Sequence, residues 1–129
     1  MMGKLTFKAK EFDELSTREL YEIARARTEV FLMEQRIICR DLDGEDYRAL
    51  HCFLEAENGT VMAYLRALTA KEAPDTVQIG RVLSLVHGKG LGKKLMLLSL
   101  TTSLTRNLQS VISSSFSCFL FYRIISGQK

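Results

Sequence analysis

The sequence predicts a single domain of α/β class, with a mixed, mainly antiparallel sheet flanked by helices. Three observations carry this prediction. Apolar and polar residues alternate over 5–9, as in a half-buried strand. The pair Asn58-Gly59 separates two apolar runs, 50–56 and 61–68, and it favours a hairpin because both residues tolerate positive φ. A glycine-rich loop then joins a further apolar run, 77–85, to a helical pattern.

The helices follow from capping and periodicity. The segment Ser16-Thr-Arg-Glu19 is a capping box, which predicts a helix that starts there and runs to about Met33. Its buried face is expected to contain Leu20, Ile23, Ala24, Val30 and Phe31. An acidic loop is expected over 36–48, a turn with the only proline over 71–75, and a second helix from Gly92 to about Leu108.

The C-terminal part is where the pattern weakens. The chain becomes serine-rich from Thr101 and has no acidic residue after Asp75. Residues 111–125 read as one strand or two short ones. We therefore treat 1–129 as one domain in which 109–129 form a divergent tail.

Composition narrows the function classes. A net charge of +3 suits an anionic ligand, but the scattered basic residues and the missing aromatic platform do not indicate nucleic-acid binding. The three cysteines lack metal-ligand spacing, so reduced thiols are expected. The first ten residues lack the apolar region of a signal peptide, and the apolar stretch 115–125 is too short for a membrane span. We expect a cytoplasmic protein.

The glycine-rich loop predicts an anion site. Gly88, Gly90 and Gly92 stand between the apolar run and the helix, so no Cβ atom would keep a phosphate from the backbone N–H groups. Lys89, Lys93 and Lys94 add positive charge. The spacing is neither G-x-G-x-x-G nor that of a P-loop. A phosphorylated cofactor other than a dinucleotide is therefore expected.

Four ordered motifs point to one family. They are R-x-x-V-F-x-x-E-Q from Arg27 to Gln35, D-x-D-G-x-D from Asp41 to Asp46 followed by His51, I-G-R-V over 79–82, and the loop 87–92. Together they resemble the ElaA-like branch of the GNAT superfamily of N-acetyltransferases. The resemblance covers roughly residues 12 to 98 and implies acetyl-CoA as acyl donor, with direct transfer of the acetyl group to a small-molecule amine or a protein amino group.

The resemblance also implies where the cofactor is held. The β-strand backbone at Val82 and Leu83 would pair with the pantetheine arm, and the loop would hold the pyrophosphate through His87, Gly88, Lys89, Gly90, Leu91, Gly92 and Lys93. Two departures stand out. His87 occupies a place where the family has Arg or Gln, and only five residues separate it from Arg81, a shorter spacing than in the family. His87 can therefore also be read as a surface histidine beside a turn.

The remaining candidate residues would activate or bind the acceptor amine. Glu34 is the best candidate for a general base, acting directly or through water, and the alternative is a solvent-facing helix residue. His51 is a second candidate, although a lone histidine opening an apolar strand is more often structural. Asp41, Asp43 and Asp46 would attract a cationic amine or form a solvated turn, with Arg27 and Arg81 bracing the loop or the cofactor side. The acidic loop does not have EF-hand spacing, so no metal is expected.

The altered loop and tail leave two rival hypotheses. The chain could be a GNAT fold that binds CoA, or nothing, without transfer. It could also be an incomplete subunit that exposes a sheet edge and completes its sheet as a homodimer.

Overall fold

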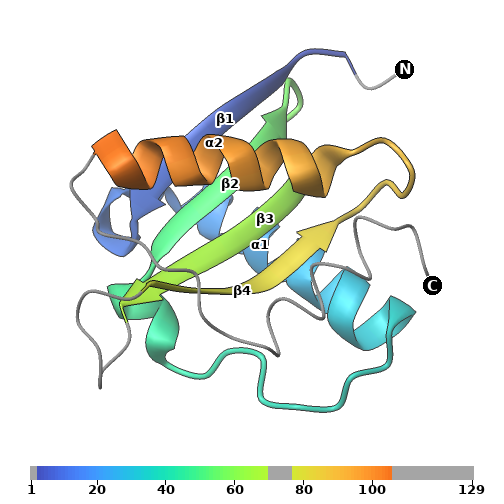
Figure 1. Cartoon of the computed structure of the whole chain (residues 1–129). Coiled ribbons are helices and arrows are strands. Elements are labelled where there is room, and N and C mark those ends of the chain that lie inside the picture. The colour runs from blue at the N-terminus through green and yellow to red at the C-terminus, as the bar shows by residue number, and fades with distance from the viewer. Residues whose placement is uncertain (1–2, 70–76, 106–129) are drawn as a thin grey trace.

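The computed structural model describes residues 3–69 and 77–105, which form a four-stranded antiparallel sheet between two helices (Figure 1). The order across the sheet follows the chain: β1 (Leu5–Glu11), β2 (Leu50–Ala56), β3 (Val61–Thr69) and β4 (Val77–Ser84). Helix α1 (Thr17–Arg27) packs on one face and α2 (Leu91–Thr105) on the other. The central strand β3 is therefore buried along nearly its whole length.

The four predicted strands that fall within the described residues, and the hairpin between the middle two, are confirmed. Strands β2 and β3 pair from Leu50 opposite Ala67 onward, and the turn between them closes at Gly59. Gly59 has a φ of 92°, and its N–H donates to the carbonyl oxygen of Ala56 at 2.9 Å. Only glycine adopts this conformation at little cost, which is why the Asn58-Gly59 pair was informative.

The capping box at the start of α1 is also present. The Ser16 hydroxyl accepts from the Glu19 N–H at 3.0 Å, and the Glu19 carboxylate accepts from the Ser16 N–H at 2.9 Å. The same carboxylate accepts from Lys8 and Lys10 of β1. Burial opposes ionisation of Glu19, but the hydrogen bonds from Lys8, Ser16 and Lys10 outweigh it and lower its pKa to about 2. Glu19 thus fastens α1 to β1.

The end of the first helix differs from the prediction. The α-helix ends at Arg27 and a π-helix, Thr28–Glu34, continues it, with the Gln35 N–H donating to the Val30 carbonyl oxygen at 2.9 Å. Hydrophobic periodicity indicates which face is buried but does not distinguish these hydrogen-bond registers. Ile23, Val30 and Phe31 are buried as expected, and Ala24 is half-buried.

Two other residues of α1 depart from the expected burial. Leu20 is 38% exposed, contrary to the prediction, whereas Arg27 is only 2% exposed. Arg27 can be buried because carboxylates from the following loop surround its guanidinium, as described below. A periodicity argument assigns an arginine to the solvent face, so it could not anticipate this arrangement.

The second helix and the acidic loop lie close to their expected positions. Helix α2 begins at Leu91, one residue before the expected start, and the acidic loop contains a short 3-10 helix, Glu45–Arg48. The turn expected over 71–75, the C-terminal end of the second helix and the tail 109–129 lie outside the described residues.

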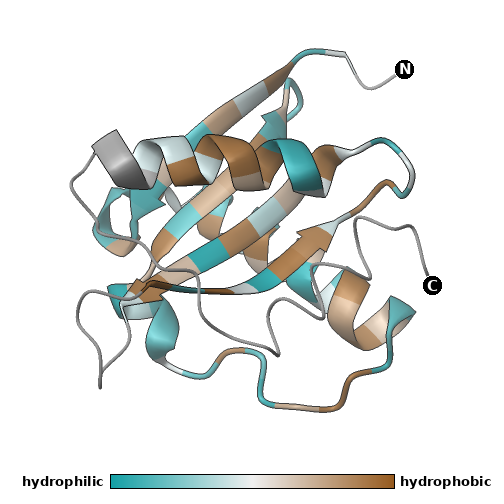
Figure 2. Cartoon of the chain, viewed as in Figure 1, coloured by the Kyte–Doolittle hydropathy of each residue, from teal (hydrophilic) through white to brown (hydrophobic). Residues whose placement is uncertain are grey.

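The core lies on both faces of the sheet. Figure 2 shows apolar residues along the strands and on α2. The most buried apolar side chains come from all layers: Ile23 and Val30, Phe53 and Leu65, Val82 and Leu83, and Leu95. No helix among the described residues has the length and apolar character needed to cross a membrane.

Candidate active site

The glycine-rich loop lies where the sequence placed it, between β4 and the start of α2. Gly88 and Gly90 have φ values of 77° and 71°, and a Cβ atom added at either would meet nothing within 4 Å. Helix α2 starts immediately afterwards, with the Lys94 N–H donating to the Gly90 carbonyl oxygen at 3.0 Å. The first N–H groups of a helix have no intrahelical partner. Exposed Lys89 and Lys93 flank these N–H groups, and this is a suitable arrangement for an anion.

His87, at the head of this loop, contacts the predicted base. Its Nε2 lies 2.7 Å from Glu34 Oε1, at the end of the π-helix, although the two residues are 53 positions apart. An ionised carboxylate only accepts, so Nε2–H is the donor and a neutral ring keeps its lone pair on Nδ1. That Nδ1 atom is buried and has no hydrogen-bond partner among the described residues. The structure therefore joins a predicted cofactor residue to a predicted catalytic residue.

Strand β4 carries a bulge close to the predicted pantetheine contact. Tyr64 of β3 lies opposite Leu83, and Arg66 lies opposite Gly80, so two residues of β4 face one residue of β3. One of the two, Arg81, has a φ of 55°, in the left-handed region. Within the described part of the chain, β4 pairs only with β3, and the backbone of its outer edge is open.

The acidic loop is held by buried arginines. Arg27 Nε donates to Asp41 Oδ2 at 3.0 Å, Nη1 to Asp46 Oδ1 at 2.8 Å, and Nη2 to the Asp41 carbonyl oxygen at 2.6 Å. Its guanidinium carbon also lies 5.7 Å from the centre of the Tyr64 ring. Burial opposes the charge on Arg27, but Tyr64 and the carboxylates of Asp46 and Asp41 raise its pKa.

Arg66 of β3 completes the arrangement. It donates to both oxygens of Asp43, at 2.9 and 2.6 Å, and to Asp46 Oδ1 at 3.0 Å. The hydrogen bond from Arg66 holds the pKa of Asp43 well below its usual range, against the opposing effect of burial. Conversely, burial disfavours the Arg66 guanidinium, and its two carboxylate partners outweigh this and raise its pKa.

Arg81 reaches the same loop from the bulge. Its Nε donates to Asp41 Oδ1 at 2.8 Å, and its Nη2 lies 3.4 Å from Asp43 Oδ2. Three arginines therefore neutralise three aspartates, which bears out the expectation that Arg27 and Arg81 brace the acidic loop. The carboxylates of Asp41, Asp43 and Asp46 each accept from one or more of these arginines, and their side chains are 25%, 26% and 14% exposed.

His51 lies beneath this cluster and is 1% exposed. Its Nε2 lies 2.9 Å from the carbonyl oxygen of Asp46, which can only accept, so Nε2 carries the proton. Its Nδ1 lies 2.7 Å from the Tyr64 hydroxyl and accepts from it. Burial lowers the pKa of His51 and keeps the ring neutral. Both nitrogens are thus occupied, an arrangement that supports the structural alternative for His51.

Two residues of the cluster were not singled out from the sequence, namely Tyr64 and Arg66. For Arg66 a signal was present, because a lone arginine stands inside the apolar run 61–68. A charge in a buried strand needs a partner of opposite sign, and the acidic loop is the obvious source. For Tyr64 there was no comparable signal, since an aromatic residue in such a strand is ordinary.

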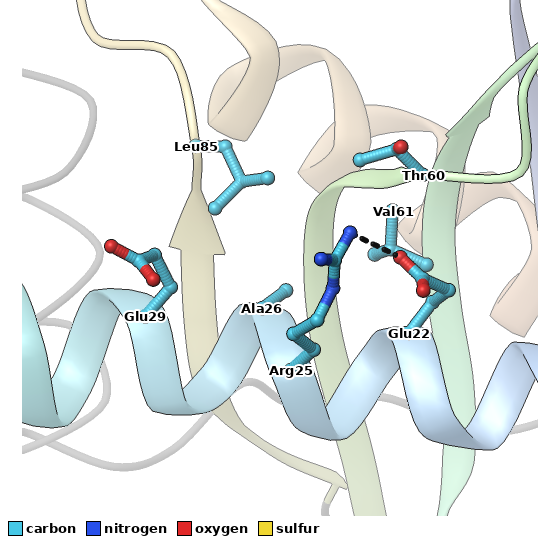
Figure 3. A pocket seen from close by; sticks show the side chains of 7 residues that line it. All are labelled: Glu22, Arg25, Ala26, Glu29, Thr60, Val61 and Leu85. Atoms are coloured by element: carbon cyan, nitrogen blue, oxygen red, sulfur yellow. Dashed lines mark hydrogen bonds and ion pairs between the residues drawn. The ribbon is translucent and has the colours of Figure 1, made fainter.

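A hollow of about 270 Å³ opens between α1, the start of β3 and the residue that follows β4 (Figure 3). It is lined by Glu22, Arg25, Ala26, Glu29, Thr60, Val61 and Leu85. Arg25 donates to Glu22 across it at 3.1 Å. None of the site residues expected from the sequence lines this hollow. Among the described residues, no group of three or more potential ligands could hold a metal ion.

Known proteins resemble the chain along most of its length. No protein-family model matches it. A UPF0039 protein of Schizosaccharomyces pombe is 39% identical over 104 residues, which cover 79% of this chain and 68% of that protein. ElaA of Escherichia coli is 34% identical over 92 residues, covering 69% of this chain and 60% of that protein.

Solved structures agree with the sequence comparison. An acyl-CoA N-acyltransferase from Pseudomonas aeruginosa superposes with a TM-score of 0.77 at 31% identity, over 92% of this chain and 85% of that one. The crystal structure of Escherichia coli ElaA gives a TM-score of 0.72 at 28% identity, over 79% and 71% of the two chains. With the strand order, the bulged β4 and the glycine-rich loop before α2, these likenesses establish that the chain belongs to the ElaA-like branch of the GNAT N-acyltransferases.

Proposed function

We propose that this chain transfers an acetyl group from acetyl-CoA to an amine, either of a small molecule or of a protein. Membership of the GNAT acyltransferases supports acyl transfer in general. The observation that favours acetyl-CoA is the loop at the start of α2, where two left-handed glycines with open space around them and exposed lysines adjoin the first N–H groups of the helix. A pyrophosphate carries the charge and the acceptor oxygens that such a site binds.

The residues present fit the cofactor. The loop from Gly88 to Lys93 would hold the pyrophosphate, and the edge of β4 that faces away from β3, at Val82 and Leu83, would hydrogen-bond the pantetheine arm. The bound thioester supplies an activated acyl group. An N–H of this edge would also stabilise the negative charge that develops on the carbonyl oxygen during transfer.

We assign proton removal to Glu34. The incoming ammonium must lose a proton before its nitrogen attacks the thioester carbon, and Glu34 is a partly exposed carboxylate beside the loop. His87 donates to it and orients it, which is a different role from the phosphate contact expected from the sequence. The C–N bond then forms and the C–S bond breaks. The nitrogen releases its second proton to solvent to become the neutral amide, and the leaving thiolate takes a proton from solvent.

The other sequence candidates receive structural roles in this proposal. Asp41, Asp43 and Asp46 hold arginines in place instead of capturing the amine. His51 fixes the Tyr64 hydroxyl and the acidic loop. The proposal therefore leaves the amine specificity to surfaces other than this loop.

Calorimetric titration with acetyl-CoA tests the cofactor site, with acetyl phosphate and ATP as controls. We expect saturable binding of acetyl-CoA alone, strongly weakened by Gly90→Glu and less by Gly90→Ala, which carries the same backbone strain without the charge. Lys93→Gln should weaken binding, whereas Arg48→Gln removes a charge at the opposite end of the sheet and should not. No binding by folded protein would refute the proposal.

Turnover is tested separately by following thiol release from acetyl-CoA with a panel of amines. Glu34→Gln should lower the rate of release and leave acetyl-CoA binding intact. Binding without release for any amine would instead support the rival hypothesis of a CoA-binding protein that performs no transfer.

A further inference from the structure

The backbone at Arg81 is in a conformation that its side chain does not favour. Its φ of 55° lies in the left-handed region, and Arg36 is the only other non-glycine residue with positive φ in the described structure. Arginine lacks the short polar side chain that lets asparagine or aspartate adopt this region by bonding locally. Such strain persists only where the surroundings over-determine it, and it concentrates at functional sites.

The surroundings of Arg81 explain how the strain is held. Its guanidinium makes contacts with one short segment of the acidic loop: Nε with Asp41 Oδ1 at 2.8 Å, and Nη2 with the carbonyl oxygens of Asp41 at 3.1 Å and Arg40 at 3.3 Å. A further contact reaches Asp43 Oδ2 at 3.4 Å. The side chain is thus anchored by charge and by backbone acceptors together.

The aspartates that bind Arg81 are themselves held by two further arginines. The second oxygen of Asp41 accepts from Arg27, and Asp43 accepts from Arg66 of β3. Asp41 therefore divides its two oxygens between an arginine on α1 and the arginine on the bulge. The loop cannot shift toward solvent without breaking buried ion pairs. The acceptor oxygens that bind the Arg81 guanidinium are therefore held in fixed positions.

The bulge decides which backbone atoms the outer edge of β4 presents. With the extra residue in place, Leu83 pairs with Tyr64, whereas an unbulged strand continuing from the Gly80–Arg66 pair would put Val82 there. A slip of one residue would exchange the two faces for every later side chain, including buried Val82 and Leu83. The same slip would also change which backbone N–H groups point away from β3 along the outer edge of β4.

We propose that Arg81 is a positioning residue: Asp41 and Asp43 clamp its side chain, which maintains the β4 bulge and so sets the register of the Val82 and Leu83 backbone against the acyl group. This rests on the proposed function for its catalytic consequence. The structural part, that the clamp maintains the bulge, stands independently of any turnover.

Two substitutions at Arg81 separate the clamp from the strain. Arg81→Ala removes the clamp and keeps the strain, whereas Arg81→Gly removes both, because glycine adopts positive φ freely. We expect Arg81→Ala to lose the nuclear Overhauser contacts between Leu83 and Tyr64 and to speed amide exchange at 82–84. Arg81→Gly should restore these contacts and the slow exchange. A residue that merely stabilised the strand would give the opposite order, since glycine inside a strand normally weakens it.

The catalytic consequence is read as a split between kcat and KM. Arg81→Ala should lower kcat by about 100-fold with little change in the KM for acetyl-CoA, as expected for misplacement of the reacting groups by about 1 Å. Asp41→Asn should lower kcat in the same way, and adding Arg81→Gly to it should recover most of the loss. Arg48→Ala, which removes an arginine bound to Glu45 of the same loop, is the matched control and should change none of these readouts.

Either of two results would overturn the inference. One is wild-type Leu83–Tyr64 contacts and exchange rates in Arg81→Ala, and the other is an Arg81→Gly variant whose contacts and exchange rates are no nearer to wild type than those of Arg81→Ala. If the wild-type protein shows no turnover, the proposed function fails. The Leu83–Tyr64 nuclear Overhauser contacts and the amide exchange rates at 82–84 still decide whether the clamp maintains the bulge.

Discussion

Replacement of Arg27 by methionine tests whether the buried ion pairs hold the fold together. Methionine fills much of the same volume but leaves Asp41 and Asp46 without the three hydrogen bonds that Arg27 donates at 2.6–3.0 Å. Breaking a buried pair commonly costs about 3–5 kcal/mol. Asp41 keeps Arg81 and Asp46 keeps Arg66, so we expect a loss near the lower end, about 3 kcal/mol of unfolding free energy.

The assay is urea denaturation followed by circular dichroism, with Arg25→Met as the matched control. Arg25 lies two positions earlier on α1, its side chain is 60% exposed, and it pairs only with Glu22 at i,i−3 among the described ion pairs. Exposed pairs of this kind contribute about 0.3–0.5 kcal/mol. Equal losses for the two variants would show that burial and the carboxylate network do not matter, and the reasoning would be refuted.

Three further predictions concern stability. Ser16→Ala removes the N-cap acceptor of α1 and should lower the unfolding free energy by about 1 kcal/mol, whereas the neighbouring Thr17→Ala should have little effect. Phe53→Ala empties a fully buried position and should cost about 3–5 kcal/mol; a loss below 1 kcal/mol would contradict the tightly packed core. Because the folded pKa of Glu19 is depressed to about 2, its stabilisation is complete above the unfolded pKa and is lost as pH falls toward 2. Urea titrations between about pH 5 and pH 2 should show a shallower pH dependence in Glu19→Gln than in the wild type, and parallel curves would count against this assignment.

The elements with local signals were predictable from the sequence. The capping box at Ser16 and the Asn58-Gly59 turn each rest on contacts within a few residues of the chain, and both are present. Alternating or continuous apolar runs located the four described strands to within about two residues. The start of α2 was displaced by one residue for a simple reason: Gly90 precedes it in a left-handed conformation that the pattern does not encode.

The features that depend on distant partners were not predictable. The left-handed Arg81 has no local signal, and its conformation follows from Asp41, which lies 40 positions away. The burial of Arg27 depends on carboxylates 14 and 19 positions later. The contact between His87 and Glu34 spans 53 positions. Each could be inferred only after the fold had brought the segments together, because charge alone does not specify a partner.

The strand order also bears on how the domain assembles. Strands β2 and β3 are joined by the four residues 57–60, whereas 38 residues, 12–49, separate β1 from β2. Short-range pairings form before long-range ones because less chain entropy is lost in closing them, so the β2–β3 hairpin is an early structure and the docking of β1 is late. Arg27 and the acidic loop lie inside the long connection, and the loop pairs with Arg66 of β3 and Arg81 of β4, so these ion pairs require the connection to have docked on the sheet. We therefore expect substitutions that weaken these ion pairs to accelerate unfolding more than they slow folding.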